Sequence, residues 1–140
     1  MEMAFVVTPL CLLLFGIVVY GYLMSFRQNM TQAAAEGARA GAVAPADAPV
    51  ATPLTHTIAI ARATDATNKA LSSFGNYSCG GGGMTCNITA GSCPTPSTAQ
   101  CVFVTVTYDY SGHPLMPDIP LVSAAIPGTF TSSSTAEINS

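Results

Sequence analysis

The sequence predicts an α+β protein with three parts: a long N-terminal transmembrane helix that extends outside the membrane, a second helix, and a small antiparallel sheet of about three strands. Three observations predict it. An uncharged apolar run, Met3 to Met24, continues into an alanine-rich stretch that favours helix. Residues 57–74 repeat their less polar positions every three or four residues. The C-terminal part contains runs that alternate between two faces, as strands do.

The composition is typical of a membrane-linked chain. Its 140 residues leave room for one modest domain beside a membrane segment. Only 8% of the residues are charged, against about 25% in ordinary soluble domains. The four basic residues are scattered along the chain and form no basic patch: Arg27, Arg39, Arg62 and Lys69. We therefore expect no nucleic-acid partner.

The apolar run is long enough to cross a bilayer, because about 20 residues suffice in a helix that rises 1.5 Å per residue. It exceeds the apolar core of a usual signal peptide, no basic segment precedes it, and the helical pattern continues beyond it. We therefore predict an uncleaved anchor. Pro9 interrupts the run early and predicts a kink or local unwinding.

Beyond the membrane, Ala33, Gly37 and Gly41 recur every four residues. Small residues at this spacing let another helix approach closely. The surface they pack against is either a neighbouring helix or the chain's own sheet, and two sides of one helix can serve both. Residues 1–43 are therefore predicted to form one transmembrane and extended N-terminal helix.

Residues 44–56 are predicted to be a linker, because they are rich in Pro and Ala. An exported α+β domain with disulfide-rich loops then spans residues 57–140. Its helix is expected over residues 57–74, with Gly75 as the C-cap. One face of this helix should be buried: Ile60, Thr64, Thr67, Leu71 and Phe74.

Four of the five cysteines lie in a turn-rich stretch and predict two disulfides: Cys79, Cys86, Cys93 and Cys101. Three pairings are possible. We favour Cys79–Cys86 with Cys93–Cys101, because each pair closes a local loop. A zinc site is the alternative, although no spacing matches a usual ligand knuckle. Cys11, inside the apolar run, is expected to be a buried, inert thiol.

The disulfides also bear on topology. Arg27 follows the apolar run, and the positive-inside rule taken alone would place the C-terminal side in the cytoplasm. Paired cysteines need an oxidising space, so we place the C-terminal domain outside the cytoplasm.

Three strands are expected, over residues 84–89, 100–110 and 129–138. The middle strand is the clearest, since alternate residues form one apolar face: Val102, Val104, Val106, Tyr108 and Tyr110. The last strand should place Phe130, Ser132, Ser134, Ala136 and Ile138 on one side. Residues 121–126 predict a short apolar helix or strand within a Pro-rich excursion. Four consecutive glycines, residues 80–83, predict a flexible bend.

The N-terminal residues resemble a known family. Glu2-Met-Ala-Phe-Val-Val-Thr-Pro-Leu-Cys-Leu-Leu-Leu-Phe-Gly-Ile17 resembles the start of TadE-like proteins, the minor pilins or pseudopilins of tight-adherence (Flp, type IVc) pili. Thr31-Gln-Ala-Ala-Ala-Glu-Gly-Ala-Arg-Ala-Gly41 is similar to the small-residue helix of the same family. The strand from Val102 to Tyr110 resembles the family's late strand more weakly.

This resemblance implies a subunit that is anchored in the bacterial inner membrane and is either assembled into a cell-surface pilus or primes its assembly. Its partners would be the lipid bilayer, other pilin and minor-pilin subunits, and the pilus assembly machinery. Glu2 would match the acidic residue near the start of pilins, which offsets a neighbour's N-terminal amine within an apolar helix bundle. Prepilin peptidase is a further partner if a basic leader precedes Met1, and the processing site is left open.

The function expected from the sequence is that of a minor pilin or pseudopilin, acting in pilus assembly or initiation and in surface adhesion. Glu2, Pro9, Ala33, Gly37 and Gly41 are the candidate residues for assembly and helix packing. The alternative is a stand-alone membrane-anchored extracytoplasmic binding module, or a secretion-system pseudopilin.

We expect neither enzymatic activity nor a cofactor or metal. His56 and His113 are the only histidines, and both are expected in exposed loops without a nucleophile nearby. Asp109 and Asp118 flank the Pro-rich excursion. Weak calcium binding is one reading of them, and turn chemistry explains them better.

Overall fold

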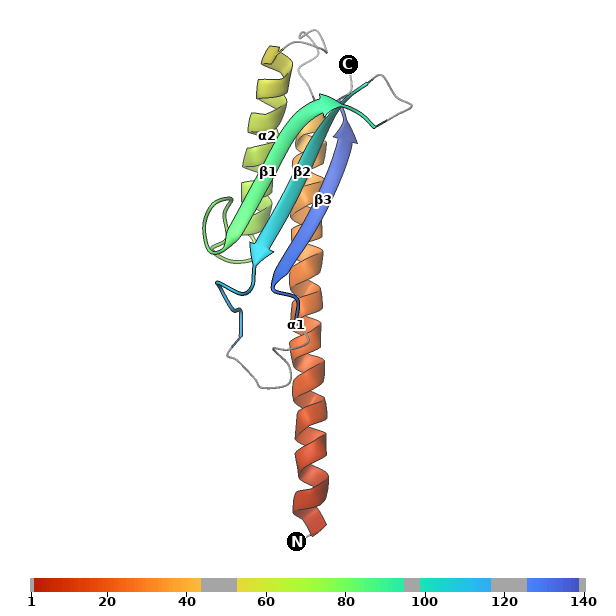
Figure 1. Cartoon of the computed structure of the whole chain (residues 1–140), viewed down its shortest axis with the longest axis vertical. Helices are drawn as coiled ribbons and strands as arrows, with labels where there is room; N and C mark the ends of the chain where they lie inside the picture. Colours follow the sequence, from red (N-terminus) through yellow and green to blue (C-terminus); the bar gives the residue numbers. More distant parts are fainter. Residues whose placement is uncertain (1, 44–52, 95–98, 117–125, 139–140) are drawn as a thin grey trace.

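The computed structural model describes residues 2–43, 53–94, 99–116 and 126–138 of the chain. One long helix runs along most of the molecule, and the second helix and the strands gather around its C-terminal half (Figure 1). The α+β fold class predicted from the sequence is confirmed. The elements follow in the order α1 (Glu2–Ala42), α2 (Pro53–Ser72), β1 (Met84–Ser92), β2 (Gln100–Asp109) and β3 (Thr129–Glu137).

Helix α1 is continuous across Pro9, so the local unwinding predicted there is wrong. A proline inside a helix removes one donor and deprives the carbonyl four residues earlier, here that of Phe5, of its partner. Good helix formers follow directly in Leu12, Leu13 and Leu14, and they favour propagation of the helix past this single defect.

Helix α2 begins at Pro53, four residues before the predicted start, so the last residues of the predicted 44–56 linker are helical. Proline favours the first helical position because its missing N–H needs no intrahelical partner there. Residues 44–52 of that linker lie outside the described part of the chain.

Helix α2 also ends earlier than predicted, at Ser72, so Gly75 is not its C-cap. The Phe74 N–H donates to the Leu71 carbonyl (3.2 Å), which closes a last turn. Phe74 itself is 45% exposed and does not belong to the buried face. That face is centred instead on Ala59, Ala63, Thr67 and Leu71, which are all buried.

The three strands form one antiparallel sheet in the order β1-β2-β3. Met84 pairs with Tyr108 at one end of the first ladder, and Cys101 pairs with Glu137 in the second. Strand β1 reaches Ser92, beyond the predicted end at residue 89. The Cys93 N–H donates to the Ala99 carbonyl (2.9 Å), so pairing with the next strand continues to the hairpin end.

The glycine run before β1 forms a defined turn. Ser78 bridges to Gly81, and the Gly81 N–H donates to the Ser78 carbonyl (3.0 Å). Gly80, Gly82 and Gly83 have φ angles of 86°, 63° and 78°. Residues with a Cβ atom rarely adopt this backbone conformation. The backbone conformation of this turn therefore explains why glycine occupies these three positions.

The sheet buries one face against the helices, as its alternation predicts. Val102, Val104, Val106 and Tyr108 are buried, and Phe130 is buried beside them on β3. Helix α1 contacts β2 and β3, whereas α2 contacts chiefly β1. The result is two layers, with helices on one face of the sheet and solvent on the other (Figure 1). Residues 121–125 of the predicted apolar segment lie outside the described residues.

The outer edge of β3, which pairs with no other strand of the described residues, allows a test of this register. The Tyr110 N–H donates to the Gly128 carbonyl and the Ile138 N–H to the Gln100 carbonyl. Antiparallel alternation then directs the N–H groups of even-numbered β3 residues toward β2 and those of odd-numbered residues outward. Ser134→Pro should therefore leave a partner carbonyl unpaired and destabilise the fold by about 1–3 kcal/mol.

Ser133→Pro is the matched control, because its N–H points to the open edge and no ladder bond is lost. Thermal unfolding followed by circular dichroism in detergent should show a clear drop for Ser134→Pro and a much smaller one for Ser133→Pro. Equal losses would contradict the register.

Candidate anchoring and assembly surfaces

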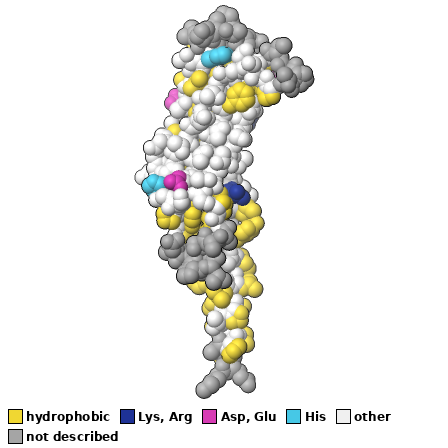
Figure 2. Space-filling model, in the orientation of Figure 1, with side chains coloured by type: hydrophobic (Ala, Val, Ile, Leu, Met, Phe, Trp, Pro, Cys, Tyr) yellow, Lys and Arg dark blue, Asp and Glu magenta, His cyan; other side chains and the backbone are white. Residues whose placement is uncertain are grey.

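The N-terminal half of α1 is an apolar rod with almost no protein around it. Its large side chains are exposed, and hydrophobic side chains line the stalk in Figure 2. Within the described residues, α1 is the one helix that is long and apolar enough to cross a membrane. Cys11 is a free cysteine on this rod, and the described part of the chain leaves it exposed. A bilayer would supply the missing cover.

The globular domain begins where the apolar stretch of α1 ends. Phe26 on α1 packs edge-on against Tyr108 of β2, with ring centroids 4.9 Å apart, and also against Tyr77 and Phe130. Tyr110 extends this group through Phe130. We call these five rings the base cluster. The Arg27 guanidinium lies 5.1 Å from the centre of the Phe130 ring, which favours a cation–π contact.

Burial in the base cluster raises the pKa of Tyr108 to about 12, and neighbouring tyrosines add to the effect. Its neutral hydroxyl donates to the His113 carbonyl oxygen (2.6 Å). Asp109 accepts from the Ser111 hydroxyl (2.6 Å) and the Gly112 N–H (3.2 Å), and these bonds lower its carboxyl pKa. The Asp109 carboxylate therefore serves a turn, while Asp118 lies outside the described residues.

The row of small residues on α1 packs against α2 of the same chain. A Cβ added to Gly37 would collide with the Thr67 hydroxyl and lie 3.2 Å from the Ala63 carbonyl oxygen. A Cβ on Gly41 would lie 3.0 Å from the Ala59 carbonyl oxygen and 3.1 Å from Val102 Cγ1. The sequence left open a neighbouring helix or the chain's own sheet. The structure instead places the chain's second helix against both glycines, and the sheet touches Gly41 through Val102.

Two other candidate residues lie in the apolar rod. Glu2 starts α1, and its side chain is outside the described part of the structure. Pro9 is exposed inside the helix. Their roles in assembly stay predictions. Ala33, in contrast, is fully buried in the domain core.

The cysteines form Cys79–Cys86 and Cys93–Cys101, the two pairs favoured from the sequence. The first pair joins the glycine turn to β1, where the Gly80 N–H also donates to the Met84 carbonyl (2.9 Å). The second pair closes the β1–β2 hairpin. All four thiols are used, so none remains for a zinc site. The described residues contain no group of three His, Cys, Asp or Glu side chains placed to hold a metal.

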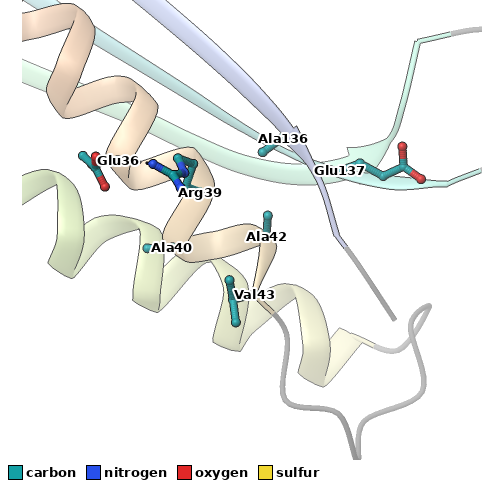
Figure 3. A pocket seen from close by; sticks show the side chains of 7 residues that line it. All are labelled: Glu36, Arg39, Ala40, Ala42, Val43, Ala136 and Glu137. Carbon is teal, nitrogen blue, oxygen red and sulfur yellow. Dashed lines mark ion pairs between the residues drawn. The ribbon is translucent and has the colours of Figure 1, made fainter.

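A hollow of about 870 Å³ lies between the C-terminal end of α1 and the end of β3. Figure 3 shows Glu36 and Arg39 on α1, with Glu137 on β3. Glu36 and Arg39 form an exposed ion pair at 3.9 Å. The lining offers two carboxylates and a guanidinium but no nucleophile: Glu36, Arg39, Ala40, Ala42, Val43, Ala136 and Glu137.

The histidines differ from each other in setting. His113 is exposed after β2, as predicted. His56 is not in a loop but in the first turns of α2, where it is half-buried. Its Nε2 atom has no hydrogen-bond partner among the described residues. Neither histidine lies in the lining of the hollow between α1 and β3.

Comparison with known proteins finds a family match in the N-terminal part of the chain. Residues 1–39 match the family model described as TadE-like protein, which confirms the resemblance seen in the N-terminal helix. No curated protein and no solved structure matches the chain. The matched stretch lies almost wholly within α1 and includes the apolar rod and part of the small-residue row.

The contact between α1 and α2 predicts a large effect from one methyl group. Gly37→Ala places that group on the Thr67 hydroxyl, and overpacking of this kind costs about 1–3 kcal/mol. The gain in helix propensity, about 0.5–1 kcal/mol, does not offset it. Thermal unfolding should therefore occur at a lower temperature than in the wild type.

Gly21→Ala is the matched control, because nothing lies within 4 Å of the added Cβ. Thr67→Ala combined with Gly37→Ala should recover part of the loss, since it removes the colliding hydroxyl. If Gly37→Ala and Gly21→Ala unfold at the same temperature, the two helices are not this close.

The Cys93–Cys101 disulfide predicts a second stability effect. It closes a loop with a sequence separation of 8, for which the chain-entropy relation gives about 2.5 kcal/mol. The Cys93→Ser/Cys101→Ser variant should lose stability of this order in denaturant unfolding, whereas Cys11→Ser should change little. Mass spectrometry without reductant should recover both linked peptide pairs, and four free thiols would refute the pairing.

Proposed function

We propose that this chain, whose first 39 residues match the TadE-like family model, is a minor pilin or pseudopilin of a tight-adherence type IV pilus. It acts in pilus assembly or initiation and in surface adhesion, as a structural subunit without enzymatic activity. The observation that carries the proposal is α1 itself: one helix whose N-terminal half is an exposed apolar rod and whose C-terminal half is the core of a domain.

This arrangement suits a subunit that is stored in a membrane and later packed into a helix bundle. In both places the rod is surrounded by apolar groups, either lipid chains or neighbouring helices. The domain lies outside the cytoplasm, where its two disulfides are stable. Partners on this proposal are the inner-membrane bilayer, other pilin subunits and the assembly machinery.

Glu2 is the residue through which we expect the rod to find its register. A carboxylate at the start of an apolar bundle is costly unless a positive group meets it. A neighbouring subunit's N-terminal amine would supply that group. The small-residue row does not serve this purpose in our proposal, because α2 already occupies it.

A specific observation supports the second candidate, a membrane-anchored binding module. The hollow between α1 and β3 lies at the end of the domain far from the apolar rod and carries two carboxylates and one guanidinium (Figure 3). A protein of that kind would stay in the membrane fraction and would never enter filaments. Filament incorporation therefore separates the two candidates.

The test uses a bacterium that carries this gene and tight-adherence pili. Deletion of the gene should reduce piliation under the electron microscope, and the wild-type protein should appear in sheared filaments. Glu2→Gln should remain in the membrane fraction but be depleted from filaments, because the register-setting charge is gone. Glu36→Gln, which removes an exposed charge outside the rod, should behave like the wild type.

Unchanged piliation in the deletion strain, with no protein in sheared filaments, would overturn the pilin proposal. Normal incorporation of Glu2→Gln would overturn only the role given to Glu2.

A further inference from the structure

The domain begins to cover α1 before the apolar stretch of that helix ends. From Met3 to Met24 the helix has no charge, and at 1.5 Å per residue these residues span about 33 Å. The hydrocarbon core of a bilayer is about 30 Å thick. When the rod spans a membrane, the hydrocarbon region therefore extends nearly to Met24.

The domain already covers α1 below that level. Leu23 packs against the hydrophobic core, and Val19 is only 9% exposed although its neighbours on the rod are open. Val19 lies five residues before Met24, which is about 7.5 Å along the helix axis. Val19 therefore lies inside the hydrocarbon boundary, and the interfacial layer begins at that boundary and extends outward. The domain residues packed beside Leu23 and Phe26 must then lie at the height of that layer.

The side chains at the height of the interfacial layer are of types that favour such a layer. Tyr20 and Tyr22 are exposed where the rod ends, and tyrosine is enriched at membrane–water interfaces. After β2, Leu115 and Met116 are half-buried against or beside the core, and Ile126 is half-buried before β3. Pro114 and Pro127 flank them and are exposed. Figure 2 shows hydrophobic side chains gathered at this end of the domain as well as along the stalk.

The positions of the charged and polar residues also fit this placement of the bilayer. Arg27 is the first charged residue after Glu2, and its guanidinium lies beside Phe130 just above Leu23. A long basic side chain at that level reaches the phosphate region while its stem stays against apolar groups. The outer face of the sheet, farther along the domain, carries mainly Thr and Ser, such as Thr131, Ser133 and Thr135. Apolar surface is therefore concentrated at one end of the domain.

We propose that this membrane-facing end, formed by Tyr22, Leu115, Met116 and Ile126, rests in the interfacial layer of the phospholipid bilayer that the rod spans. The inference rests on the proposed function, because it takes α1 as the anchor. The subunit then holds the membrane at two contacts, the rod and the domain end. Both must be released before the subunit can enter a filament, and the domain's height above the membrane is fixed.

The chain contains no tryptophan, so a single introduced Trp reports its own surroundings. We would reconstitute full-length variants in phosphatidylcholine vesicles with and without lipids brominated on their acyl chains. Leu13→Trp tests the rod, Met116→Trp and Pro127→Trp test the domain end, and Thr135→Trp tests the outer sheet face. Two variants on different segments keep the test valid if one of them fails to fold.

The expected result is strong quenching and a shift to shorter wavelength for Leu13→Trp, and a smaller loss of emission for both domain-end variants. Thr135→Trp should be unquenched. Quenching of Leu13→Trp alone overturns the second contact and leaves the anchor standing. Absence of quenching at Leu13→Trp overturns the anchor and the contact together. Equal quenching at Thr135→Trp shows non-specific adsorption and also overturns the proposal.

Discussion

The close packing of α1 against α2 is the contact on which the rest of the structure depends. A methyl group at Gly37 would collide with α2 and one at Gly41 would be crowded by it, and the facing positions on α2 are Ala59, Ala63 and Thr67. Helix α2 has few large apolar side chains, so an ordinary hydrophobic face would not hold it. Its burial comes from backbone-close contact instead. Strands β2 and β3 then cover α1, and α2 meets the sheet chiefly at β1.

This contact makes the C-terminal half of α1 part of the domain core. Ala33, Ala34 and Ala38 are buried, whereas the same helix thirty residues earlier touches almost nothing. One continuous helix thus has two surroundings, protein at one end and, in our proposal, lipid or other helices at the other. No flexible hinge separates anchor from domain within α1, so a displacement of the rod along its axis moves the domain with it.

The domain is small, and covalent links reinforce its edges. The two disulfides act at opposite ends of β1: one ties the glycine turn to the strand, and the other closes the hairpin to β2. The base cluster performs a similar task without covalent bonds at the level where α1 leaves the domain. A domain of this size has a low ratio of core to surface, which explains the use of such links.

Much of this structure could be predicted from local sequence patterns alone. The uncharged run of α1, the alternation of β2 from Val102 to Tyr108, and the local cysteine pairs follow from periodicity and short loop closure. These features are fixed by neighbours in the chain. The start of α2 at Pro53 was missed because a Pro-rich stretch predicts a loop, and nothing in the local pattern marks Pro53 as the first residue of a helix.

Only the tertiary structure decided what the small-residue row packs against. Ala33, Gly37 and Gly41 permit close approach by any helix, and the sequence cannot distinguish a neighbour's helix from α2. The buried face of α2 was also beyond local reasoning, since alanine and threonine give a weak signal and Phe74 a misleading one. The sequence by itself determined which segments are helix, strand and apolar rod, because those depend on local periodicity. Which surfaces remain free for assembly depends on contacts between distant segments, and therefore on the fold.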